Sequence, residues 1–286
     1  MATTVATPSI STLAISRRVS YSRAFVGLML RDLRVLRREV GPFLVRVIMN
    51  PLLFLFVFTY VMPHMTNGAS MNPTAQMAST SGGFGTVLLP GLMAVAIMFS
   101  GIAAVALPLA QEFGITREID DRVMCPLPVA AVAIQKICFS AIQSMIAAAV
   151  VFPLAYYVPS TPVLAHVNNW PFFIAVLVLA SLTAGALGLT IGTAVSPSQI
   201  GLIFGVVVMP ITFLGCVYYP WEALKPLKWL QRGVLINPIV YMSEGLRASL
   251  TPTAHMPDWL ILLMLSFFLV LLSWLGIKGF LRRVIG

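Results

Sequence analysis

Long runs without a single Asp, Glu, Lys or Arg dominate this chain. Residues Val47–Gln111 form one such run of 65 residues, and Ile137–Trp221 form another of 85 residues. A helix needs about 20 apolar residues to cross the hydrocarbon core of a bilayer, so these runs have room for two and three spans. A further apolar stretch covers Trp259–Ile277, and only 9% of all residues are charged, against about 25% in a soluble domain. The sequence therefore predicts an integral membrane protein.

The spans are expected to be helices, because backbone N–H and C=O groups inside lipid need internal partners. The apolar runs are continuous and lack the alternation of barrel strands. We therefore expect an all-α protein with six transmembrane helices in one membrane domain, residues 21–286. The predicted spans are Val47–Pro63, Phe84–Ala110, Ile137–Val158, Phe172–Val195, Gly201–Tyr219 and Trp259–Ile277.

Residues 1–20 contain many small and hydroxylated side chains and lack the apolar core of a signal peptide. Arg17 and Arg18, with no acid before Asp32, leave an organellar transit peptide open. We expect a flexible cytoplasmic tail instead.

The net charge of +9 is distributed unevenly along the chain. Eight of the 18 Lys and Arg residues lie between Arg17 and Arg46, three lie between the second and third spans, and three follow the last span. Because cytoplasmic loops of membrane proteins are enriched in Lys and Arg, we expect both termini and the second connection in the cytoplasm. This distribution indicates a multi-pass membrane protein that contacts lipids and no nucleic acid.

The segment 21–40 is predicted to form an amphipathic helix. At 100° per residue its apolar side chains share one sector. They are Phe25, Val26, Met29, Leu33, Leu36 and Val40. The opposite side contains arginines, among them Arg31, Arg34 and Arg38. Such a helix lies in the headgroup plane, and the residues leave open whether it also contacts a cytoplasmic partner.

The connection 111–136 concentrates charge between the second and third spans. We expect a two-turn helix over Thr116–Met124 that ends before Pro126, because proline interrupts a helix. The charged side chains of this connection either face solvent or contact a cytoplasmic partner. The candidate residues are Glu112, Arg117, Glu118, Asp120, Asp121 and Arg122.

The segment 221–250 contains six charges, too many for an isolated span. Asn237-Pro238 divides it, because proline disfavours helix at the preceding residue. Its Trp and Tyr residues suit a membrane interface, so we expect two half-helices that form a re-entrant hairpin in the outer leaflet. Glu244 and Arg247, one turn apart, either brace the second half-helix or hold the segment at headgroup depth.

Part of this segment resembles a family signature. Leu230-Gln231, followed by Asn237-Pro238-Ile239-Val240-Tyr241-Met242-Ser243-Glu244-Gly245-Leu246-Arg247, is similar to the string before the last span of type-2 ABC exporter permeases, including nodulation-factor and daunorubicin exporter permeases. The order of interface helix, charged connection and hairpin extends the resemblance to about residues 17–283. The connection departs from the family, with Gly114-Ile115-Thr116-Arg117-Glu118-Ile119-Asp120-Asp121 where a Gly-Thr-Leu-Glu-like stretch is often found.

The resemblance implies the permease subunit of an ATP-driven exporter in a bacterial-type inner (plasma) membrane. It implies that the interface helix and the connection 111–136, the coupling loop, contact a separate cytoplasmic ABC ATPase, and that two permease chains, identical or different, work together. The sequence contains no G-x-x-x-x-G-K-[ST] phosphate loop. We therefore expect no cofactor and no enzymatic activity in this chain, with MgATP bound and hydrolysed by the partner, and no metal site.

Two other classes of protein stay open. A secondary transporter usually has ionisable residues at mid-membrane, and the predicted span interiors contain none, although carbonyls and hydroxyls can bind sodium. A membrane-embedded enzyme needs reactive side chains at depth, and the spans offer mainly amides and hydroxyls. For an exporter we expect an amphipathic, lipid-like, glycolipid or drug substrate. The candidate path residues are Met98, Phe99, Phe204, Met209 and Phe213. Contact with lipid or with neighbouring helices also explains them, and packing in the core is the default explanation.

Overall fold

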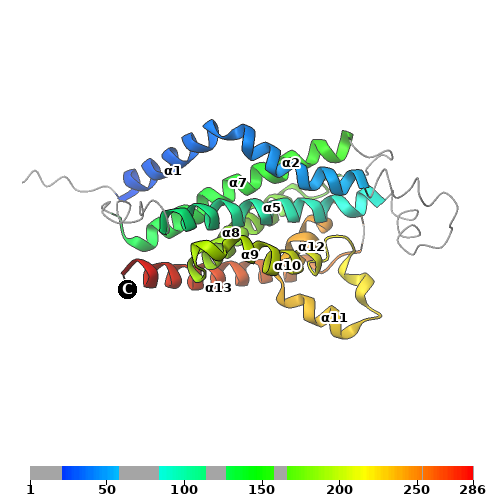
Figure 1. Cartoon of the computed structure of the whole chain (residues 1–286). Coiled ribbons are helices and arrows are strands. Elements are labelled where there is room, and N and C mark those ends of the chain that lie inside the picture. The colour runs from blue at the N-terminus through cyan, green and yellow to red at the C-terminus, as the bar shows by residue number, and fades with distance from the viewer. Residues whose placement is uncertain (1–20, 58–83, 114–126, 158–165, 253, 286) are drawn as a thin grey trace, which may run out of the picture.

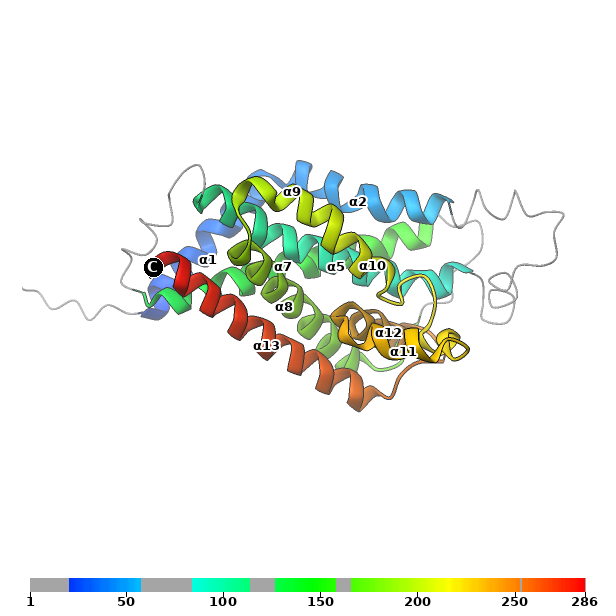
Figure 2. The same cartoon turned by 60° about the horizontal axis from the view of Figure 1, so that its bottom comes forward.

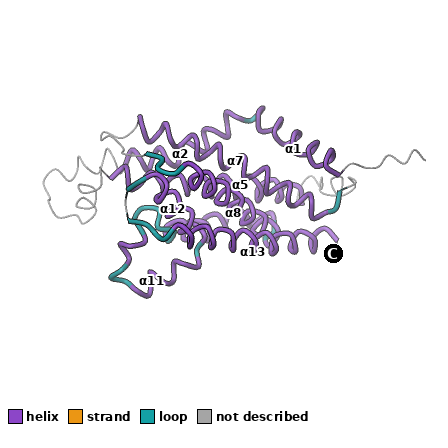
Figure 3. The backbone as a smooth tube through the Cα atoms, turned by 180° about the vertical axis from the view of Figure 1, so that it is seen from behind, coloured by secondary structure: helices purple, strands orange, loops and turns teal. Residues whose placement is uncertain are grey.

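The chain is described by a computed structural model over residues 21–57, 84–113, 127–157, 166–252 and 254–285. Within these ranges the regular structure is helical throughout, without a strand (Figure 1, Figure 3). The all-α prediction is confirmed for this part of the chain. It follows from the need of backbone groups in lipid for internal hydrogen-bond partners.

Four helices are long and apolar enough to cross a bilayer. They are α5 (Phe84–Gln111), α7 (Val129–Tyr157), α8 (Trp170–Ala194) and α13 (Asp258–Ile285). The apolar part of each contains 25 to 27 residues, above the roughly 20 that a span requires. These helices coincide with four of the six predicted spans.

The other two predicted spans fall on shorter helices. One is α2 (Val40–Phe56). The other is a continuous run of α9 (Ile200–Ile203), the π-helix η5 (Phe204–Val208) and α10 (Met209–Phe213). Their apolar stretches contain only 10 to 17 residues, so six crossings stay a prediction.

Helix α5 occupies the centre of the bundle, with α7 and α8 against it and α13 against α8 (Figure 1, Figure 2). A methyl group at Gly188 of α8 would collide with the backbone of Ile102, so the two helices approach closely. Hydroxyls add hydrogen bonds between helices: Ser140 Oγ donates to the Gly101 carbonyl at 2.9 Å, and Thr190 Oγ1 donates to the Leu272 carbonyl at 3.0 Å. Small residues and hydroxyls of this kind join helices in lipid.

The two ends of the bundle differ in charge. Helix α1 (Tyr21–Arg38), the last turn of α5, the start of α7 and the end of α13 lie at one end, on the left of Figure 1. Helix α11 (Lys228–Gly233) and α12 (Pro238–Leu250) lie at the other end. The arginines of α1 and of the last turn of α13 are therefore at the same end.

The segment 221–250 is divided at Asn237-Pro238, as predicted. Asn237 caps α12, and its Oδ1 accepts the Ile239 N–H at 3.1 Å. Before this point the structure has η6 (Trp221–Leu224), α11 and η7 (Val234–Ile236) instead of one half-helix. Its position in the outer leaflet stays a prediction.

Candidate functional site

Helix α1 contacts the bundle along one line of residues. Leu36 is buried, and Phe25, Met29 and Asp32 are partly buried, all spaced three or four residues apart. Val26 and Leu33, which the sequence placed on the same apolar face as Phe25, are exposed. Arg31, Arg34 and Arg38 are exposed as well. The helix therefore packs on the protein with a polar residue, Asp32, in the contact line and leaves apolar side chains free for lipid.

Two side-chain interactions join α1, α5 and α7. The Gln135 Nε2 of α7 donates to Asp32 Oδ2 of α1 at 2.9 Å. The next residue, Lys136, places its Nζ 2.8 Å from Oε2 of Glu112, directly after α5. Adjacent positions of α7 thus hold α1 on one side and the end of α5 on the other.

The Glu112–Lys136 pair also explains why α7 begins before the predicted span. The span was placed after Lys136 because a charge is costly in lipid. The structure continues the helix back to Val129, since the charge of Lys136 is paired inside the protein.

The ion pair closes the base of the charged connection 111–136, because Glu112 lies at its start and Lys136 at its end. Of the predicted coupling residues, Glu112 is the one that the structure describes. The others lie outside the described residues, as does the expected helix Thr116–Met124. They are Arg117, Glu118, Asp120, Asp121 and Arg122.

A polar groove of about 450 Å³ runs between α1, α2, α5 and α7. Its charged lining comes from several helices and includes Arg31, Asp32, Glu39, Arg46, Glu112 and Lys136. Most of these residues are engaged: Asp32 accepts the Gln135 amide, and Glu112 pairs with Lys136. The groove is thus a charged surface at the end of the bundle that contains α1 and the connection.

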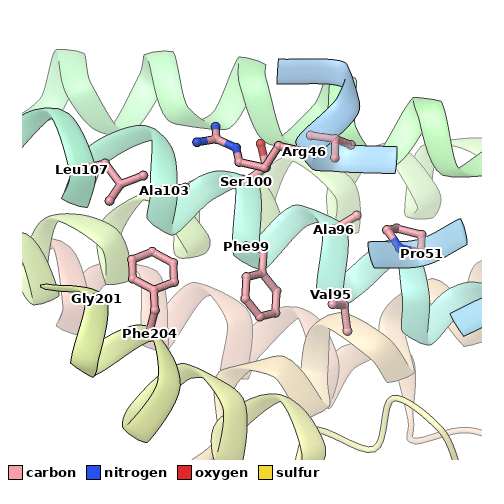
Figure 4. Close-up of a pocket in the computed structure, with 11 residues that line it drawn as sticks. Arg46, Pro51, Val95, Ala96, Phe99, Ser100, Ala103, Leu107, Gly201 and Phe204 are labelled. Carbon is pink, nitrogen blue, oxygen red and sulfur yellow. The ribbon is translucent and has the colours of Figure 1, made fainter. Parts of the chain in front are cut away.

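An apolar cavity of about 420 Å³ adjoins this groove, between α2, α5 and the α9–η5 run. Figure 4 shows Arg46 approaching it from α2, Phe99 from α5 and Phe204 from η5. Ser100, which also lines it, donates to the Gln143 carbonyl at 3.4 Å. A largely apolar concave site with a few polar groups is typical of small-molecule binding.

The five predicted path residues do not line one passage. Phe99 and Phe204 meet at the apolar cavity. Met98 is fully buried in the core, where packing accounts for it. Met209 and Phe213 are exposed, at 44% and 53%. Packing in the core, the alternative explanation, therefore accounts for Met98. Of the five residues, Phe99 and Phe204 line the apolar cavity.

The signature residues Glu244 and Arg247 form a fully buried ion pair within α12. Glu244 accepts the Trp221 N–H at 3.0 Å and the Met256 N–H at 3.3 Å, and Arg247 Nη2 donates to the Cys216 carbonyl at 3.1 Å. The pair thus fastens α12 to the segment before η6 and to the segment before α13. The pair therefore connects α12 to two other segments, in addition to bracing the half-helix itself. Its full burial differs from what a position among lipid headgroups would require.

The other signature residues position α12. Asn237 Nδ2 donates to the Ile211 carbonyl of α10 at 2.6 Å, and Tyr241 OH donates to the Leu235 carbonyl at 2.9 Å. Pro238, at the first helical position, is buried. A methyl group at Gly245 would collide with Val176 of α8 and Ile261 of α13. Most of the quoted string therefore has a packing or hydrogen-bonding role.

Sequence reasoning did not single out Asp32, Gln135, Lys136 or Arg46 as site residues. Gln135 and Lys136 carried a signal, because polar side chains at the start of an apolar helix need partners. Asp32 was also detectable as the first acid among the arginines of α1. Arg46, the last charge before a 65-residue uncharged run, was counted only toward topology.

The helical bundle, its apolar helices and its charged end define a polytopic α-helical membrane protein. The protein family described as ABC-2 type transporter matches residues 23–251. The chain belongs to this family. The match begins in α1 and ends directly after α12, so it includes the three segments that carried the resemblance in sequence: most of the interface helix, the charged connection and the segment 221–250.

Relatives that match over a shorter stretch are the inner membrane transport permeases YadH of Escherichia coli K12, Escherichia coli O157:H7 and Shigella flexneri. Each is 28% identical over 164 residues, which is 56% of this chain. The match covers 60% of the length of each relative. No solved structure matches the chain significantly.

Proposed function

We propose that this chain is the transmembrane subunit of an ATP-driven exporter that moves an amphipathic substrate out of the cytoplasm. A separate ABC ATPase binds and hydrolyses MgATP, and a second permease chain, identical or different, completes the transport unit. The family supports the transporter class, and the name of the YadH relatives supports an inner-membrane location.

The observation that carries the proposal is the joint contact of α1, α5 and α7. The Asp32–Gln135 hydrogen bond connects the arginine-rich interface helix to α7. The Glu112–Lys136 ion pair connects α7 to the residue directly after α5, so the two ends of the coupling loop are joined. An ATPase that moves either element therefore moves α7, and through it the central helix α5. This gives a mechanical route from a cytoplasmic partner into the bundle.

The same end of the bundle is proposed to face the cytoplasm. It contains α1 and the last turn of α13 with Arg282 and Arg283, and cytoplasmic segments are enriched in such residues. With α2 and the α9–α10 run as the two remaining spans, both termini lie in the cytoplasm. The segment 221–250 then forms the outer hairpin.

Affinity purification of the tagged chain from the membranes of its own host tests the proposal. The expected result is one co-purifying protein with a G-x-x-x-x-G-K-[ST] phosphate loop, and crosslinked species that contain two permease chains. Membrane vesicles should then take up amphipathic dyes only when ATP is supplied. Uptake driven by a proton or sodium gradient without ATP would favour a secondary transporter and contradict the proposal.

A further inference from the structure

The polar groove and the apolar cavity adjoin each other and share part of their lining. Arg46, Ala103 and Leu107 line both of them. Along the face between α2 and α5, the lining therefore changes from charged, near Glu112 and Asp32, to apolar, near Phe99 and Phe204. Such a change in polarity along one face matches the shape of an amphiphile, with a polar head and an apolar chain.

Arg46 lies at the junction of these two parts. Among the residues that the structure describes it makes no hydrogen bond or ion pair, whereas Lys136 in the same groove is paired with Glu112. Glu39 also lines the polar groove, but it does not line the apolar cavity. Arg46 is thus the one charged side chain of the described residues that reaches both parts.

We propose that this joined cavity binds an acidic amphiphile, with a phosphate or carboxylate head at Arg46 and an apolar chain against Phe99 and Phe204. A guanidinium group offers two parallel N–H donors that match a phosphate or carboxylate. The chain gains from leaving water in the apolar part. The proposal rests on the proposed function in one respect: it names the class of cargo that the permease takes from the cytoplasmic side.

The competing explanation is that Arg46 only extends to the headgroups of bulk lipid, as long basic side chains do. The two explanations differ in where an acidic amphiphile accumulates. Bulk lipid contacts the exposed apolar face of α13, where Phe267 and Val270 are 53% and 69% exposed, as readily as the cavity. A specific site binds the acidic probe at the cavity and not at α13.

Photolabelling separates these explanations. The probe is hexadecyl phosphate with a diazirine on its chain, and the matched neutral probe is hexadecanol with the same diazirine. The full chain is embedded in phosphatidylcholine nanodiscs, and labelled peptides are identified by mass spectrometry. We expect the acidic probe to label peptides that contain Phe99 and Phe204 about tenfold more than the neutral probe, the effect of one charge-assisted contact. At Phe267 and Val270 the two probes should label equally.

Two variants and two competitors complete the test. Arg46→Gln should reduce the preference for the acidic probe to near one. Arg38→Gln removes an equal charge from a residue that lines neither cavity, and should leave the preference unchanged. Unlabelled dodecyl phosphate should compete and inorganic phosphate should not, which distinguishes an amphiphile site from a free-phosphate site.

Equal labelling by the acidic and neutral probes in the wild-type chain would overturn the proposal, and this comparison does not depend on any variant folding. Equal preference at the cavity and at α13 would overturn it as well. Binding is measured without ATP or a partner chain. A failure here therefore leaves ATP-driven transport untouched, and a failure of ATP-driven transport leaves the binding result standing.

Discussion

Lys136 and Glu112 form an ion pair that closes the coupling loop at its base. The Nζ lies 2.8 Å from Oε2 and 2.9 Å from Oε1, and the two side chains are 7% and 6% exposed. The residues are 24 positions apart, one directly after α5 and the other in the second turn of α7. The ends of the loop are therefore held together whatever the loop itself does.

Breaking this pair should be costly. Lys136→Met leaves the Glu112 carboxylate buried without its partner, which is expected to lower the free energy of unfolding by about 3–5 kcal/mol. Thermal unfolding of the purified chain in nanodiscs measures the effect. The exchanged variant Glu112→Lys with Lys136→Glu should recover part of the loss.

A matched control is available at the other end of the bundle. Lys225 pairs with Glu222 at 3.1 Å, but the two side chains are 64% and 36% exposed. Lys225→Met should therefore change stability by only about 0–1 kcal/mol. Equal effects of Lys136→Met and Lys225→Met would contradict a structural role for the buried pair.

The Asp32–Gln135 hydrogen bond should couple α1 to α7 during transport. Asp32→Ala and Gln135→Ala are each expected to weaken the dependence of ATP hydrolysis on substrate, and the double variant should be no worse than either single variant, because both remove one interaction. Asp258→Ala, which removes an exposed acid at the start of α13 that lines neither cavity, is the control. Additive effects of the two single variants would show that the residues act independently.

Glu118 and Asp121 should contact the ATPase. Changing both to lysine would place like or unpaired charges in the partner's cleft, at a cost of about 2–5 kcal/mol. We expect loss of ATPase binding in co-purification and loss of transport, with insertion into the membrane unchanged. Normal transport by the double variant would show that the loop is only solvated.

The topology can be tested at α11 and its neighbours. Single cysteines at Lys225, Lys228 and Arg232, in a background without the three native cysteines, should react with an impermeant thiol reagent added outside intact cells. All three residues are exposed in the structure. Reaction only from the cytoplasmic side would reject both the outer hairpin and the six-span arrangement.

Much of the fold could be predicted from the sequence, because lipid leaves few choices. Helices α5, α8 and α13 follow from uncharged runs of sufficient length, and α12 begins where Asn237-Pro238 requires it to begin. The start of α7 was predicted too late, because a composition rule treats Lys136 as a charge facing lipid or water. Only the three-dimensional structure shows Glu112 beside it.

The candidate site was predictable as a set of elements and less so as a set of side chains. The amphipathic pattern of α1 and the signature string before the last span both fall on helices in the structure, α1 and α12. The partners of Glu244, namely the Trp221 and Met256 N–H groups, are backbone groups of other segments, which no side-chain pattern reveals. The cavity needs the relative placement of α2, α5 and η5, and sequence periodicity does not contain that information.

The most direct test of the account is the rate of ATP hydrolysis by the purified chain in nanodiscs, measured alone and with its co-purifying ATPase. The account predicts no hydrolysis by this chain alone, since it lacks a phosphate loop. It predicts hydrolysis with the partner, which an acidic amphiphile stimulates and which stops when the lysine of the partner's phosphate loop is replaced. Sustained hydrolysis by this chain alone, or transport that continues without any ATPase, would contradict the account.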